Sequence, residues 1–192
     1  MARQKVGRVG GLLLTPGAGA GRDHPTLVAI EEALAPLPVT RVDFPYRKEG
    51  RKAPDRAPKL IASVVADTES FAAATGITPG SLVLGGRSMG GRICSMAVAE
   101  GLPAAGLILL SYPLHPPAKP ENLRIEHLPA LEVPCLFISG TRDSFGSPEE
   151  LEAQTAAIPG PVTHHWLEGK GHAPKGCDDE ISAVVSAWIE RL

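Results

Sequence analysis

Short apolar runs alternate with segments of helical periodicity along most of the chain. Each run has the length of a β-strand, and most of the segments between the runs repeat apolar residues every three or four positions. Nearly all-apolar strands separated by helices predict the α/β fold class, with a mainly parallel sheet that helices cover on both faces. The expected strands are 9–14, 38–43, 81–85, 105–110, 134–139 and 162–167, and the expected helices are 25–35, 58–75, 90–101, 148–157 and 178–191.

The loops that follow the strands are where a parallel sheet gathers functional groups, because the carboxyl ends of its strands meet at one edge. We therefore expect four of these loops to lie close together. Two Pro-rich stretches, 44–58 and 111–129, also leave strand ends on this rim, and we expect them to wall a pocket. The four loops are 15–24, 86–90, 140–147 and 168–176.

Composition favours one compact domain covering residues 1–192. The chain has 192 residues, of which 43% are hydrophobic, and it contains neither an internal repeat nor a linker. Its formal net charge is −2, and both signs are spread along the chain. This distribution argues against nucleic acid or an anionic membrane surface as a partner, since either would require a concentrated positive field.

Targeting and redox features indicate a cytoplasmic protein. The charged, glycine-rich segment from Met1 to Gly11 precedes only three leucines, which is too short for a signal-peptide core. No run approaches the roughly 20 apolar residues of a membrane span. The three cysteines lack the paired spacing of a zinc site or a disulfide framework, and we interpret Cys94 and Cys135 as small core residues.

A serine stands where an apolar strand is expected to turn abruptly into a helix. Ser88 is flanked two positions away on each side by Gly86 and Gly90. Such a corner brings the residues at plus and minus two almost into contact, so that side chains there would clash. The pattern predicts a serine nucleophile, although a glycine-rich loop whose serine only caps the next helix would give the same letters.

A serine nucleophile needs a base and a carboxylate, and the chain supplies both further along. A serine hydroxyl reacts well only when a neutral imidazole takes its proton and a carboxylate orients that imidazole. Asp143 follows the expected strand 134–139, and His172 follows 162–167. Either residue alone has a simpler explanation, as a turn residue or a solvated histidine, but their joint placement with Ser88 predicts a catalytic triad.

Two backbone N–H groups are candidates for the oxyanion hole. One belongs to Met89, the residue after the expected nucleophile, and the other to Ala18 in the glycine-rich loop after the first strand. A glycine-rich loop of this kind can also form a nucleotide site. A dinucleotide fingerprint starting at Gly17 would need glycine at position 22, which is Arg22, and the phosphate-loop pattern is missing. The predicted mechanism requires no metal and no cofactor.

Four side chains on the rim are candidates for the pocket wall: Tyr46, Arg87, Tyr112 and Phe145. Arg87, like Arg142, adjoins a member of the expected triad. Such arginines could favour an anionic acyl group, but we favour a local salt bridge or a solvated loop charge as their role.

His164 and His165 lie within the expected strand 162–167. We expect at least one of them to be packed and hydrogen-bonded rather than catalytic.

With the triad assigned, nearly the whole chain resembles the dienelactone hydrolase-like branch of the α/β hydrolases, in a small form without a lid domain. More narrowly, it resembles a bacterial group whose eukaryotic relatives include a testis-expressed protein and subunit three of the nonspecific lethal chromatin complex. The stretches that carry this resemblance are 45–46, 50–58, 85–92, 112–117, 119–121 and 140–146.

The resemblance implies six strands in the order 2-1-3-4-5-6, with the Ala18 loop beside Ser88. Dienelactone hydrolases use a cysteine nucleophile, whereas this chain has Ser88, so hydrolysis of a small carboxylic ester or thioester is the expected activity. The alternative is a catalytically idle interaction scaffold, since the chromatin-complex relatives are taken to act as interaction subunits. The sequence predicts no oligomeric state.

Overall fold

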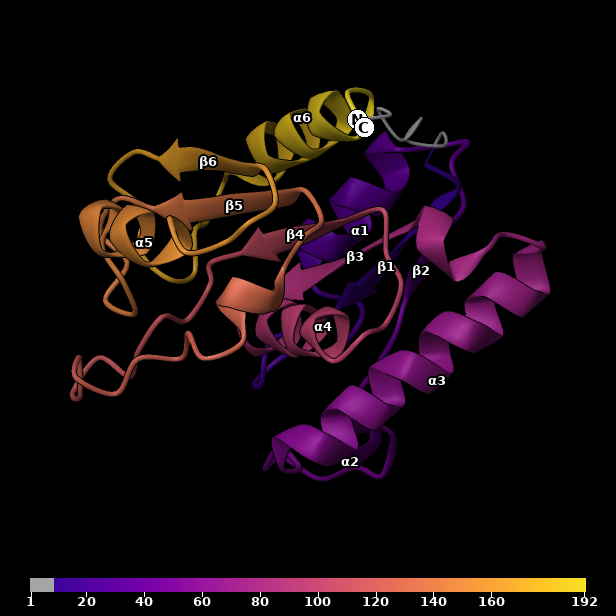
Figure 1. The fold of residues 1–192 in the computed structure, drawn as a ribbon, viewed down its shortest axis with the longest axis horizontal. Helices are drawn as coiled ribbons and strands as arrows, with labels where there is room; N and C mark the ends of the chain where they lie inside the picture. Colours follow the sequence, from indigo (N-terminus) through magenta and orange to yellow (C-terminus); the bar gives the residue numbers. More distant parts are fainter. Residues whose placement is uncertain (1–8) are drawn as a thin grey trace.

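The computed structural model describes residues 9–192, and most of the segment from Met1 to Gly11 lies outside them. Six strands form one sheet in the order β2-β1-β3-β4-β5-β6, and every neighbouring pair is parallel (Figure 1). The single-domain α/β fold and the strand order are as predicted. The strands are β1 (Gly11–Thr15), β2 (Val39–Arg41), β3 (Leu82–Arg87), β4 (Gly106–Leu110), β5 (Cys135–Gly140) and β6 (Val162–Leu167).

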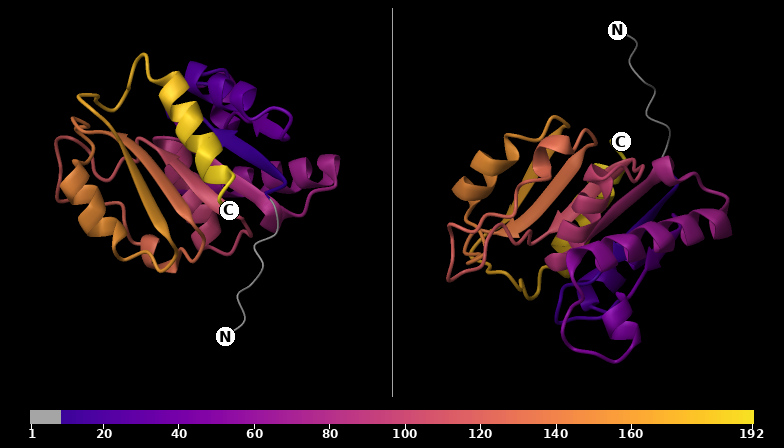
Figure 2. Two further views of the ribbon diagram at one scale, coloured as in Figure 1. Left: turned by 90° about the horizontal axis from the view of Figure 1, so that it is seen from above. Right: turned by 60° about the horizontal axis from the view of Figure 1, so that its bottom comes forward.

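Helices cover both faces of the sheet (Figure 2). Helices α1 and α6 pack on one face, and α3, α4 and α5 pack on the other. The longer helices are α1 (Pro25–Ala33), α3 (Ala57–Thr75), α4 (Met89–Ala99), α5 (Pro148–Thr155) and α6 (Asp178–Ile189). Short helices that the sequence did not predict are α2 (Pro45–Lys48), η1 (Pro79–Ser81) and η2 (Leu128–Ala130).

Local chemistry sets the helix ends. His24 caps α1 by accepting a hydrogen bond from the Thr26 N–H, and Pro25 opens the first turn. Gly76 ends α3 in the left-handed conformation with φ of 70°. Ser147 and Glu150 form a reciprocal capping box at the start of α5.

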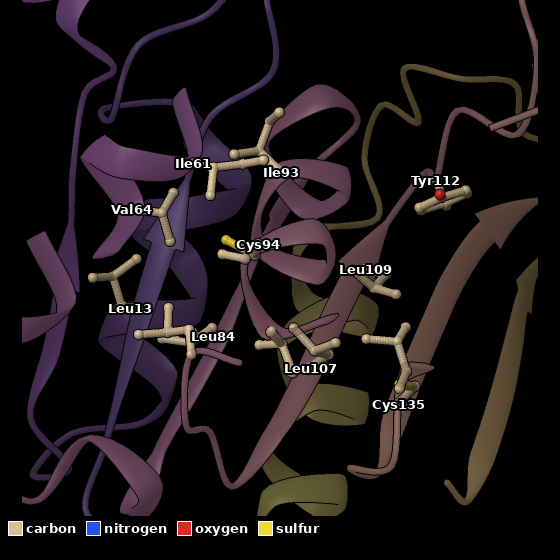
Figure 3. Packing of buried hydrophobic residues seen from close by; sticks show 14 of the residues in the cluster. Leu13, Ile61, Val64, Leu84, Ile93, Cys94, Leu107, Leu109, Tyr112 and Cys135 are labelled. Atoms are coloured by element: carbon tan, nitrogen blue, oxygen red, sulfur yellow. The ribbon is translucent and has the colours of Figure 1, made fainter. Parts of the chain in front are cut away.

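The alternation of side chains along the buried strands divides the core into two layers. Leu13 faces α3 and α4, whereas its neighbours Leu12 and Leu14 face α1 and α6. Figure 3 shows the first layer, in which Cys94 and Cys135 pack among aliphatic side chains. The two cysteines are core residues as predicted, and burial raises the pKa of each thiol to about 12.

Candidate active site

Ser88 occupies a strained corner between β3 and α4. Its backbone has φ of 52° and ψ of −119°, which a residue with a side chain rarely adopts. Its N–H donates a hydrogen bond to the Leu110 carbonyl oxygen of the neighbouring strand at 2.7 Å. The Ser88 side chain makes no capping hydrogen bond to α4, so the interpretation of this serine as a helix cap is wrong.

Gly86 and Gly90 let the corner pack against the end of β1. A Cβ atom on Gly90 would lie 2.5 Å from the Pro16 carbonyl oxygen and 2.5 Å from Thr15 Oγ1. A Cβ atom on Gly86 would lie 3.1 Å from the Gly90 carbonyl carbon and even closer to Thr15. Side chains at these two positions would therefore force the corner away from β1.

Three side chains from distant parts of the sequence form one hydrogen-bonded line. His172 Nε2 lies 2.8 Å from Ser88 Oγ, and His172 Nδ1 lies 2.8 Å from Asp143 Oδ2. Asp143 follows β5 and His172 follows β6, and these strands are neighbours in the sheet. With a neutral imidazole, the network assigns the proton to Nδ1, which donates to Asp143, and leaves Nε2 to accept from Ser88.

The loops around this line are fixed by further contacts. The Phe145 N–H donates to Asp143 Oδ1 at 2.8 Å, and the Phe145 ring stacks on the imidazole of His172 with ring centroids 4.0 Å apart. The Arg142 N–H donates to the Lys170 carbonyl oxygen at 2.8 Å, which ties the two loops together. The carboxylate of Asp143 is almost completely buried, with 1% of its side chain exposed.

Arg87 forms a hydrogen bond with the histidine loop rather than a salt bridge. Its Nη2 donates to the His172 carbonyl oxygen at 3.0 Å, and burial lowers the pKa of its guanidinium group. The side chain of Arg142 is exposed to solvent. The two arginines thus have different surroundings, although each is next in sequence to a residue of the hydrogen-bonded line: Arg87 to Ser88, and Arg142 to Asp143.

Ala18 and Met89, the candidates for the oxyanion hole, lie on either side of Ser88. Met89 is the first residue of α4, so its N–H has no carbonyl partner within the helix. The Ala18 loop follows β1 and comes so close that a Cβ atom on Gly17 would be 3.6 Å from Ser88 Cβ. The hydroxyl of Tyr46 donates to the Ala18 carbonyl oxygen at 2.8 Å.

A cavity of about 450 Å³ opens above Ser88. Arg87 and Phe145 line it, whereas Tyr46 and Tyr112 do not, and both tyrosines are buried beneath the rim with at most 1% of their surface exposed. Of the two Pro-rich stretches, 111–129 contributes to the wall but 44–58 does not. The lining residues are Gly17, Ala18, Gly19, Arg87, Ser88, Met89, Arg92, Pro113, Arg124, Phe145 and His172.

Two lining residues, Arg92 and Arg124, were missed by the sequence analysis. Arg92 stands four positions after Ser88, and this helical spacing puts both residues on one face of α4. The spacing is therefore a sequence signal that places Arg92 near Ser88. Arg124 belongs to the long irregular segment between β4 and β5, where no periodicity indicates which side chains turn inward.

Both histidines of β6 make packing or hydrogen-bonding contacts away from Ser88. His164 stacks between Phe137 and Trp166, and its Nε2 lies 2.9 Å from Thr155 Oγ1. His165 Nε2 lies 2.9 Å from Glu180 Oε1 on α6. Neither residue lines the cavity at Ser88.

A family model described as alpha/beta hydrolase domain matches residues 9–180. The chain belongs to this family. In the part of this alpha/beta hydrolase that the structure describes, no helix is long and apolar enough to cross a membrane.

Solved structures with the same fold include several hydrolases. Est1E from Butyrivibrio proteoclasticus is 16% identical, with a TM-score of 0.76 over 96% of this chain and 88% of that one. RedJ thioesterase, from the prodiginine biosynthetic pathway of Streptomyces coelicolor, is 18% identical, with a TM-score of 0.69 over 96% and 92%. A dienelactone hydrolase from Anabaena variabilis is 18% identical, with a TM-score of 0.73 over 96% and 87%.

Proposed function

We propose that this alpha/beta hydrolase is a serine hydrolase that cleaves a small carboxylic ester or thioester through an acyl-enzyme intermediate. The observation that carries the proposal is the line of hydrogen bonds from Asp143 through His172 to Ser88, which opens into the cavity. The strained backbone of Ser88 adds support, because strain of this kind concentrates at functional sites.

The arrangement suits acyl transfer. His172 Nε2 takes the proton of Ser88 Oγ while that oxygen attacks the substrate carbonyl carbon, and Asp143 stabilises the imidazolium that forms. The N–H groups of Ala18 and Met89 hold the negative charge that develops on the carbonyl oxygen. His172 then returns the proton to the departing alcohol or thiol. Water, activated by His172, attacks the acyl-enzyme and releases the acid together with free Ser88.

The proposed family branch, compartment and substrate class rest on separate observations. The sequence stretches given above support a place in the dienelactone hydrolase-like branch. Cys94, Cys135 and Cys177 are all unpaired, which fits a reducing compartment such as the cytoplasm. Lipolytic enzymes and a thioesterase share this fold, so paired oxygen and thiol esters of one acyl group should be compared as substrates.

A fluorophosphonate probe tests the proposal, because it phosphonylates only an activated serine. We expect one label, mapped by mass spectrometry to Ser88. Replacement Ser88→Ala should abolish labelling and lower the kcat on short 4-nitrophenyl esters by about four to six orders of magnitude, while leaving the melting temperature near that of the parent. A folded parent protein that neither labels nor turns over esters would refute the proposal and favour the interaction scaffold.

A further inference from the structure

Of the three guanidinium groups that line the cavity, that of Arg87 interacts with the charge of Asp143, whereas those of Arg92 and Arg124 have no carboxylate to neutralise them. Arg92 projects from α4, and Arg124 comes from the segment between β4 and β5. Among residues 9–192, neither arginine has an Asp or Glu oxygen within 4.0 Å, whereas Arg41 and Arg51 each form two such pairs. The Nε of Arg92 is buried and donates to no acceptor. Arg124 Nη1 donates to the Pro113 carbonyl oxygen at 3.3 Å.

The two charges are close enough to affect each other. Burial lowers the pKa of Arg124, and the positive charge of Arg92 lowers it further. His127 beside them adds no positive charge at neutral pH, because burial and Arg92 lower its pKa to about 4. Glu126, the carboxylate in this region, is exposed and forms no ion pair with either arginine. At this part of the cavity wall, the positive charges of Arg92 and Arg124 are therefore uncompensated.

Such an arrangement is unfavourable until an anion occupies it. Partly desolvated like charges raise the free energy of the empty site, and an unpaired buried donor adds to that cost. A guanidinium group offers parallel N–H donors that match the two oxygens of a carboxylate. The most direct way to satisfy both arginines is a carboxylate on the ligand.

The position of the pair limits the ligand's length. The backbone N–H of Arg92 donates to the Ser88 carbonyl oxygen at 3.2 Å, so the Arg92 backbone lies one helical turn beyond the nucleophile, about 6 Å along the helix axis. A carboxylate bound there would be separated from the reacting carbonyl by only a few carbon atoms.

Arg87, rather than the pair, contacts the loop that carries His172. Its Nη2 donates to the His172 carbonyl oxygen, and among residues 9–192 no hydrogen bond or ion pair joins His172 to Arg92 or Arg124. In the proposed reaction the leaving group departs beside His172, which protonates it. The acyl part of the substrate then extends toward Arg92 and Arg124.

From these observations we infer that Arg92 and Arg124 form a carboxylate-binding subsite for the acyl group, so the preferred substrates are monoesters or monothioesters of short dicarboxylic acids. The inference rests on the proposed function, and it names the substrate class of the same site.

Two matched substrates test the carboxylate-binding subsite. Mono(4-nitrophenyl) glutarate and 4-nitrophenyl pentanoate have acyl chains of equal carbon number and differ in the terminal carboxylate. We expect the glutarate ester to have the higher kcat/KM. Replacement Arg92→Gln or Arg124→Gln should lower kcat/KM for this ester by about 10- to 100-fold, the range for a lost charged hydrogen bond, and change the value for the neutral ester by less than about threefold.

The chain offers a control position outside the cavity. Arg56→Gln removes an exposed positive charge outside the cavity and should affect neither ester. Arg92→Lys and Arg124→Lys retain the charge, and they replace a Gln variant that fails to fold. No preference for the glutarate ester, or equal losses on both esters, would overturn the subsite.

If neither ester is turned over, the proposed function fails, and calorimetric titration with glutarate decides the subsite separately. Binding that is lost in both Gln variants supports the subsite, and no binding to the parent protein overturns it.

Discussion

The hydroxyl of Tyr46 donates a hydrogen bond to the carbonyl oxygen of Ala18, 2.8 Å away. Tyr46 lies on α2, is completely buried and stacks beside Phe44, with ring centroids 6.4 Å apart. Burial raises the pKa of Tyr46, so the hydroxyl keeps its proton at neutral pH and remains a donor. The bond fixes the peptide on one side of Ala18, whose N–H on the other side is a candidate for the oxyanion hole.

Replacement Tyr46→Phe should therefore lower kcat more than it changes KM. The ring stays packed, but the Ala18 loop loses its anchor, and we expect a loss of about 1 kcal/mol of stability with a three- to tenfold decrease in kcat. Steady-state kinetics and thermal unfolding measure the two effects. An unchanged kcat with the same loss of stability would limit Tyr46 to a structural role.

Gly90→Ala should damage the corner at Ser88. The new Cβ atom would meet the Pro16 carbonyl oxygen and Thr15 Oγ1 at 2.5 Å, so the backbone has to move. We expect a loss of about 1–3 kcal/mol in the free energy of unfolding, as for overpacked cores, together with reduced fluorophosphonate labelling. Gly80→Ala is the matched control, because its nearest new contact is 3.8 Å from Pro103 Cβ. Equal stability of the two variants would contradict this explanation.

The regular elements could be predicted because their signal is local. All six strands and the five longer helices lie within two residues of the expected ranges at every end. Helix α2 was missed because four residues are too few to show a helical period, and it lies within a Pro-rich stretch. The expected strand 38–43 shortens to three residues at the sheet edge, where it pairs with β1 alone.

The meeting of Ser88, Asp143 and His172 could be anticipated from topology, because parallel strands bring the loops at their carboxyl ends together. The residues of the cavity wall could not be anticipated in this way. The sequence places Tyr46 and Tyr112 on rim segments, but these segments fold back, and the Tyr112 hydroxyl donates to the Arg124 carbonyl oxygen at 2.6 Å beneath the rim. Which side of an irregular segment faces inward depends on such long-range contacts, which leave no periodic trace in the sequence.

The ring of Phe145 restrains the imidazole of His172. The two rings stack at 4.0 Å with an interplanar angle of 28°. Phe145→Ala keeps the backbone N–H that donates to Asp143 but removes the stack, which is worth about 0.5–1.5 kcal/mol and predicts a two- to tenfold decrease in kcat on a small ester. Phe145→Leu, which still fills the space, should lose less. Full activity of the Ala variant in a steady-state assay would show that the imidazole is held without the ring.

The pKa of His127 predicts a loss of stability in mild acid. Burial, helped by the positive charge of Arg92, lowers this pKa from 6.5 to about 4, and His127 Nε2 lies 2.8 Å from Ser95 Oγ. Between these two pH values the unfolded chain binds more protons at this position than the folded one, so the free energy of unfolding must fall as the pH falls. The contribution of neutral His127 to the free energy of unfolding is complete above about pH 6.5. After allowance for partial solvent screening, this contribution of His127 amounts to about 1–2 kcal/mol.

Urea unfolding of the parent protein and of His127→Gln at several pH values isolates the contribution of His127, since carboxylate effects are common to both proteins. The difference between the two proteins should change between pH 6.5 and 4 and stay constant above that range, and parallel curves throughout would show that His127 titrates alike in both states.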